Sequence, residues 1–139
     1  GLDIGVGFGS DDSNKSSTVI KDLESIGAYA NYVFRPMTVG YSFTETTGGA
    51  SGHGANVTGA YGVVFAVNEN LSISYNEHTN SYHKAGGSAD VDQDSTGMAI
   101  AYTMGSASIK IQNNETKNDG GVTTAKTKEN TEISLSLAF

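Results

Sequence analysis

Apolar and polar residues alternate with a period of two along most of this chain, and helical periodicity is nearly absent. Ile4, Val6 and Phe8, for example, alternate with glycines. This pattern is typical of β-strands whose two faces meet different surroundings. It predicts an all-β, antiparallel fold in one domain, residues 1–139. Eight strands are expected, over residues 1–9, 25–34, 37–45, 55–66, 71–79, 96–104, 107–116 and 131–139.

Three short connections fix how these strands should pair. Arg35-Pro36 and Gly105-Ser106 are expected as two-residue turns, and residues 67–70 as a slightly longer one. Each hairpin then brings apolar residues opposite one another, as stable cross-strand pairing requires. The expected pairs are Phe34–Met37, Tyr32–Val39, Ala30–Tyr41, Met104–Ala107, Tyr102–Ile109, Ile100–Ile111, Phe65–Leu71, Val63–Ile73 and Tyr61–Tyr75.

The connections differ in length in a regular way. The short ones all fall at one end of the strands, and segments 10–24, 46–54, 80–95 and 117–130 fall at the other. Outer-membrane β-barrels have this arrangement, together with aromatic girdles that bound an outward apolar band. The aromatic residues that would form two such girdles are Phe8, Phe34, Phe43, Phe65, Tyr75 and Phe139. The alternation therefore favours an antiparallel transmembrane β-barrel.

The second face of each strand is small and polar. A barrel closed by eight strands alone has an interior that large side chains must fill. Because the expected inward residues are mostly Gly, Ala, Ser and Thr, they suit a wider barrel with water inside. Lys110 is the one basic residue expected in a strand on this face, where it would tune ion preference or take a polar partner. The predicted pore-lining residues are Asp3, Asn31, Ser42, Thr58, Ser74, Asn76, Thr103, Lys110, Gln112 and Glu132.

Composition excludes several other classes of protein. The 139 residues include no cysteine, so disulfides, thiolate zinc sites and cysteine nucleophiles are ruled out. The net charge is −7 and no basic cluster exists, which argues against a nucleic-acid partner. No apolar run approaches the ~20 residues of a transmembrane helix. No Ser-His-Asp set can be placed, so we expect neither enzymatic activity nor a cofactor.

The N-terminus carries neither a basic segment nor an apolar one, and it lacks an initiator methionine. We therefore expect a mature or trimmed product, or a fragment. The lack of cysteine fits a location outside the cytoplasm.

Asp90, Asp92 and Asp94 alternate in a predicted loop and form the one weak candidate for a divalent-cation site. Carboxylate oxygens suit calcium. The EF-hand pattern fails, however, because the sixth position is Ser95 rather than glycine. A solvated acidic loop tip is the simpler interpretation, and divalent bridging to lipopolysaccharide is a third.

The last eight residues, Glu132–Phe139, alternate and end in phenylalanine. This ending resembles the C-terminal signal strand of Gram-negative outer-membrane proteins. Residues Gly59–Gly62, Leu71–Tyr75 and Gly97–Tyr102 resemble strands of general porins from marine alphaproteobacteria. The chain is thus similar to the C-terminal portion of such a porin, which implies half of a 16-stranded, trimeric barrel. The porin constriction loop has no counterpart here.

The resemblance implies an outer-membrane porin, or part of one, that passes small hydrophilic solutes by passive diffusion. Its partners would be outer-membrane lipid, lipopolysaccharide and further copies of the chain. Two alternatives remain at this point. The first is a closed eight-stranded barrel that acts as an anchor or adhesion module through its long loops. The second is a soluble β-sandwich binding domain, which would bury the apolar face between two sheets.

Overall fold

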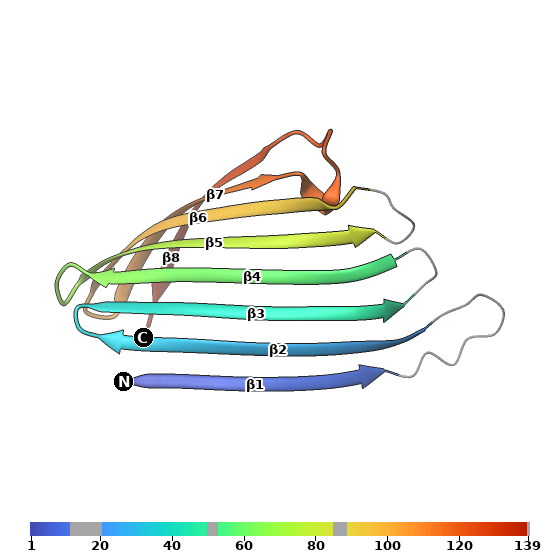
Figure 1. Ribbon diagram of the computed structural model, residues 1–139. Coiled ribbons are helices and arrows are strands. Elements are labelled where there is room, and N and C mark those ends of the chain that lie inside the picture. Colours follow the sequence, from blue (N-terminus) through green and yellow to red (C-terminus); the bar gives the residue numbers. More distant parts are fainter. Residues whose placement is uncertain (12–20, 50–52, 85–88, 139) are drawn as a thin grey trace.

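The eight strands form one antiparallel sheet in which every strand pairs with its neighbours in chain order (Figure 1). The computed structural model describes residues 1–11, 21–49, 53–84 and 89–138. A single turn of 3₁₀ helix, η1 (Asp119–Gly121), precedes the last strand. The strands are β1 (Leu2–Asp11), β2 (Lys21–Phe34), β3 (Met37–Gly49), β4 (His53–Ala66), β5 (Leu71–Lys84), β6 (Val91–Met104), β7 (Ala107–Lys117) and β8 (Lys128–Leu137).

All eight predicted strands are confirmed, but most continue further toward the long connections than expected. β5 runs to Lys84 rather than to residue 79, and β6 begins at Val91 rather than at residue 96. Only residues 50–52 separate β3 from β4, so the longer connection expected there is wrong. These extensions are mostly polar and show no regular alternation, yet their backbones continue the hydrogen-bonded ladder. The short turns do gather at one end of the sheet (Figure 1).

The predicted register is confirmed in two hairpins and wrong in one. Phe34 faces Met37 and Met104 faces Ala107, as expected. Between β4 and β5 the pairs are instead Phe65–Ile73, Val63–Tyr75 and Tyr61–Glu77, a shift of two residues on the same face. The turn explains the shift. Val67 N–H donates to the Leu71 carbonyl at 2.8 Å, and Asn68 Oδ1 accepts from the N–H groups of Asn70 and Leu71.

The sheet is open and has a single layer. In the described residues β1 pairs only with β2, and β8 pairs only with β7. A closed eight-stranded barrel is therefore not what these strands form, and they do not divide into the two packed sheets of a sandwich. Figure 1 shows the sheet curling, so that β7 and β8 turn behind the strands in front.

The fold has almost no core of its own. Val91, 7% exposed, is the one buried apolar residue in the described part of the chain. The accessible surface is 9711 Å², whereas a globular monomer of this mass exposes about 6,800 Å². Within the described ranges, the chain has no helix of the length and apolarity that a membrane crossing needs.

One hydrogen-bonded row across the sheet is apolar from end to end. It starts beside the Arg35-Pro36 turn and crosses seven strands. In order, its residues are Phe34, Met37, Phe65, Ile73, Ile100, Ile111 and Ile133. All side chains in one row share a face. We call this side, which also carries Ile4, Val6 and Phe8, the apolar face, and the opposite side the polar face.

The Asn68 side chain should determine the β4–β5 register, since its Oδ1 atom satisfies two turn N–H groups. We expect Asn68→Ala to lower the free energy of unfolding by about 1–2 kcal/mol. Asn70→Ala is the matched control, because only its backbone joins this network, and it should change stability by less than about 0.5 kcal/mol. Denaturant titration of the folded chain, in detergent where required, measures both. Equal effects would contradict the capping role.

Candidate functional site

The ten residues predicted to line a pore all lie on the polar face. The register places them there strand by strand: Asp3, Asn31, Ser42, Thr58, Ser74, Asn76, Thr103, Lys110, Gln112 and Glu132. The five girdle residues inside the described ranges lie on the apolar face: Phe8, Phe34, Phe43, Phe65 and Tyr75. Phe139 lies outside the described residues. The two predicted groups thus lie on opposite faces of the sheet within the described residues.

A single row on the polar face consists of asparagine and glycine residues from β2 to β8. It runs through β2 to β8 and begins opposite Asp3 of β1. In order, its members are Asn31, Gly40, Gly62, Asn76, Gly97, Asn114 and Asn130. We call this set the amide row. Asn31 and Asn76 are among the predicted pore-lining residues, and the register of β6 to β8 adds Asn114 and Asn130 to the same row.

Glycine in the amide row leaves room for the neighbouring amides to lie across the sheet. A methyl group added at Gly97 would come within 3 Å of the Oδ1 atoms of both Asn76 and Asn114. One added at Gly40 would collide with Asn31 Oδ1. Larger residues at Gly40 and Gly97 would therefore displace the neighbouring asparagine carboxamides from their positions across the sheet.

The charged residues of the polar face are few and spread out. Glu132 lies opposite Gln112 and accepts a hydrogen bond from Ser134 Oγ at 2.8 Å. Lys110 lies opposite Ser134 and is exposed. No ion pair involves Lys110 within the described part of the chain. A lysine in this setting exposes an unneutralised positive charge to whatever occupies the polar face.

The segment that contains η1 folds over the polar face near the long connections. Gly120 N–H donates to Gln93 Oε1 at 2.7 Å, and Tyr82 Oη reaches the same oxygen at 3.4 Å. Asn118 Nδ2 donates to the Asp92 carbonyl at 2.9 Å. These contacts hold the segment against β5 and β6, so it narrows the space above that part of the face. The segment lies within the long connection expected over residues 117–130.

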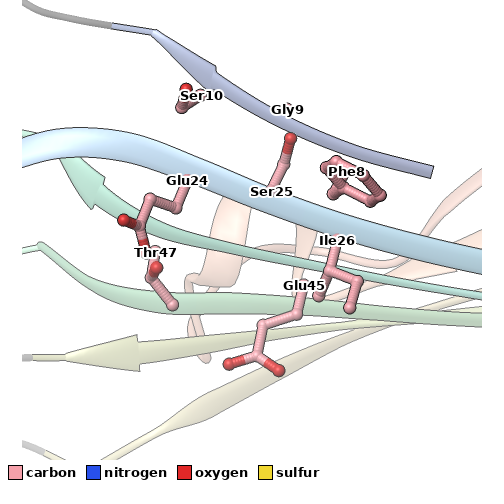
Figure 2. Close-up of a pocket in the computed structure, with 8 residues that line it drawn as sticks. All are labelled: Phe8, Gly9, Ser10, Glu24, Ser25, Ile26, Glu45 and Thr47. Carbon is pink, nitrogen blue, oxygen red and sulfur yellow. The ribbon is translucent and has the colours of Figure 1, made fainter.

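On the apolar face, the large side chains give way to carboxylates toward the long connections. Figure 2 shows this border at an open hollow over β1 to β3, where Phe8 and Ile26 lie next to Glu24 and Glu45. Acidic residues form this border on β2, β3 and β5 to β8. In chain order they are Glu24, Glu45, Glu77, Asp92, Asp94, Glu115 and Glu129.

Glu77 is a further residue of this border that the sequence did not single out. Its Oε2 atom accepts hydrogen bonds from Tyr61 Oη at 2.5 Å and from Tyr75 Oη at 3.0 Å. The two tyrosine rings are 6.4 Å apart. The cluster ties β4 to β5 at the level where the apolar residues end.

The three aspartates proposed for a cation do not form a metal-binding group. Asp94 accepts a hydrogen bond from Thr79 at 3.0 Å, and Asp90 Oδ2 lies 2.8 Å from His83 Nδ1. Asp92 lies opposite Ser81 in the ladder. Among the described residues, no three His, Cys, Asp or Glu side chains come close enough to hold a metal ion.

Comparisons of the chain with protein-family models, with curated proteins and with solved structures found no match.

Docking of the η1 segment can be tested at two adjacent glycines. Gly120 and Gly121 both have positive φ, at 67° and 71°, so alanine at either position costs about 1 kcal/mol. Only at Gly121 would the added methyl group meet another side chain, 2.7 Å from the Tyr82 ring. We therefore expect Gly121→Ala to speed tryptic cleavage after Lys126 more than Gly120→Ala does. Equal cleavage rates would show that the segment is not held by Tyr82.

Proposed function

We propose that this chain forms part of the wall of an outer-membrane porin, through which small hydrophilic solutes pass by passive diffusion. The apolar face would contact lipid, and the polar face would line the water-filled lumen. The observation that carries the proposal is the broad apolar face, which no other part of the described chain covers. Val6 and Phe8, for example, are 84% and 89% exposed. Surfaces of this kind indicate contact with a membrane or a partner.

The slope of the apolar residues across the sheet supports a tilted barrel. Within the apolar row, Met37 of β3 lies next to a short turn, and Ile133 of β8 lies four residues before Leu137 at the same end of the sheet. Neighbouring strands lie about 4.8 Å apart and successive residues about 3.3 Å apart. A line along the short-turn end of the sheet therefore makes an angle of roughly 30° with the hydrogen-bonded rows. Strands in outer-membrane barrels tilt by about 35–45°, so a horizontal lipid band fits this sheet.

The small polar face supports a lumen that holds water. Unpaired hydroxyl and amide groups are tolerated where water satisfies them, and they are costly in a dry core. β1 and β8 leave unpaired backbone groups at the two edges of the sheet. In the proposed pore these edges pair with further strands of a second copy or of a longer chain, because exposed edges otherwise aggregate. Lipopolysaccharide would meet the acidic border of the apolar face, with divalent cations between the two anionic surfaces.

The first prediction of this proposal concerns conductance. The purified chain, added to a planar bilayer, should give discrete open-channel steps. Because the chain carries a net charge of −7, the reversal potential in a salt gradient should show a weak preference for cations. Folded protein that binds lipid without conducting would contradict the porin proposal. Firm anion selectivity would contradict the predicted preference for cations.

A second prediction uses the two sides of β7. Lys110 lies on the polar face, whereas Lys117 lies on the apolar side, 3.2 Å from Glu115 Oε1. Lys110→Glu should shift the reversal potential toward stronger cation preference, because it replaces a lumenal positive charge with a negative one. Lys117→Glu makes the same charge change on the other side and should leave the potential nearly unchanged. Equal shifts would contradict the assignment of the lumenal face.

A further inference from the structure

The two edge strands, β1 and β8, can each accept a further strand, and their directions are compatible. Within the described residues neither edge has a partner on its outer side. β1 begins and β8 ends at the short-turn end of the sheet (Figure 1). A β8 strand placed beside β1 would therefore run antiparallel to it, as all neighbouring strands of this sheet do.

The unpaired backbone groups of both edges belong to residues of the apolar face. Gly1 and Val33 exchange backbone hydrogen bonds at 2.6 and 2.8 Å, and Ala138 N–H donates to the Ser106 carbonyl at 2.8 Å. Successive residues of a strand direct their N–H and C=O groups to opposite sides. The polar-face residues of β1 and β8 therefore bond inward. The outward groups belong to Ile4, Val6 and Phe8 on β1 and to Ile133, Leu135 and Leu137 on β8.

One register joins these outward groups and also matches the side chains. Its pairs are Ile4–Leu137, Val6–Leu135 and Phe8–Ile133. A shift of two residues in one direction places Phe8 opposite Thr131, and in the other direction it places Ile133 opposite Ser10. Either shift sets a large apolar side chain beside a polar one and loses an apolar cross-strand pair. The two edges thus select a single register.

The slope that this register implies is that of a barrel. Ile133 shares a row with Phe34, whereas Phe8 lies opposite Ile26, eight residues earlier in β2. Pairing Phe8 with Ile133 therefore offsets the rows by eight residues over the eight strands. At about 3.3 Å per residue and about 4.8 Å per strand, the strands would tilt by roughly 35°. Barrel strands typically tilt by about 35–45°.

We infer that a second copy of this chain supplies the missing neighbour, with β1 of each copy paired to β8 of the other in this register. Figure 1 shows that β7 and β8 already turn behind the front strands, so a second sheet with the same curl would bring the wall back to β1. One chain closed on itself fits less well, because side chains fill an eight-stranded barrel and this polar face carries mostly small ones. The inference rests on the proposed function, since it names the partner that completes the wall of the pore.

The test is disulfide cross-linking between two single-cysteine variants, since the chain has no cysteine. The register places Gly7 of one copy opposite Ser134 of the other in a non-hydrogen-bonded pair. Cα atoms in such pairs lie about 4.5 Å apart, which a disulfide can bridge. A methyl group added at Gly7 would meet no atom within 4 Å. Gly7→Cys and Ser134→Cys, refolded together in detergent and oxidised, should therefore give a covalent heterodimer. Closure of one chain on itself cannot produce it.

Gly9→Cys mixed with Ser134→Cys is the matched control, because these two positions lie opposite each other only after a shift of two residues. Its yield of heterodimer should be lower by about fivefold or more, since diagonal Cα atoms lie about 7–8 Å apart and exceed the reach of a disulfide. Circular dichroism confirms that each variant is folded. Equal yields in the two mixtures would overturn the register.

Light scattering of the unmodified chain in detergent provides a second readout, and it should give twice the mass of one chain. A folded particle with the mass of one chain, or no heterodimer from folded variants, would overturn the second copy. Neither measurement needs conductance, so failure of the pairing and failure of the pore are distinguishable. A heterodimer without conductance would support the pairing and contradict the porin proposal. Conductance without a heterodimer would overturn the pairing alone.

Discussion

The rest of the molecule depends on one constraint: the sheet has an apolar face that no other part of the described chain covers. The apolar row from Phe34 to Ile133 crosses seven strands, yet only Val91 among the described apolar residues is buried. At about 25 cal/mol per Å² of apolar surface, covering such a face is a large favourable term. A sheet this apolar on one side and this polar on the other is stable where the two sides meet different solvents. The proposed lipid and water meet that condition.

The same constraint accounts for the opposite face. Where water fills the space, side chains need not pack, so glycine, serine and asparagine are sufficient. The amide row follows from that freedom, since Gly97 gives Asn76 and Asn114 the room to lie across the wall. Near the long connections, by contrast, Tyr82 and Gln93 hold the η1 segment over the same face. The polar face is thus open in its middle and partly covered at one end.

Period-two alternation was sufficient to predict the eight strands, although the longer connection expected over residues 46–54 was wrong. Register was predictable where two-residue turns left no freedom, as at Gly105-Ser106. It was not predictable at the β4–β5 turn, because a shift of two residues keeps every apolar side chain on the same face. The hydrogen bonds to Asn68 Oδ1 select one of these registers, and the alternation of apolar and polar residues contains no information about those bonds. Consequently the Tyr61–Glu77 pair and the full amide row emerged only from the structure. The extensions of β5 beyond residue 79 and of β6 before residue 96 were not predicted, because their mostly polar residues show no regular alternation.

The most direct test of the account is whether lipid touches one face of the sheet and not the other. The chain has no tryptophan, so a single introduced tryptophan is an unambiguous reporter. Ile73 and Ser74 are adjacent in β5 and lie on opposite faces. In vesicles of lipid brominated on its acyl chains, Ile73→Trp should be strongly quenched, and Ser74→Trp should respond instead to a water-soluble quencher. Equal quenching of both by brominated lipid, or quenching of neither, would contradict a sheet that separates lipid from water.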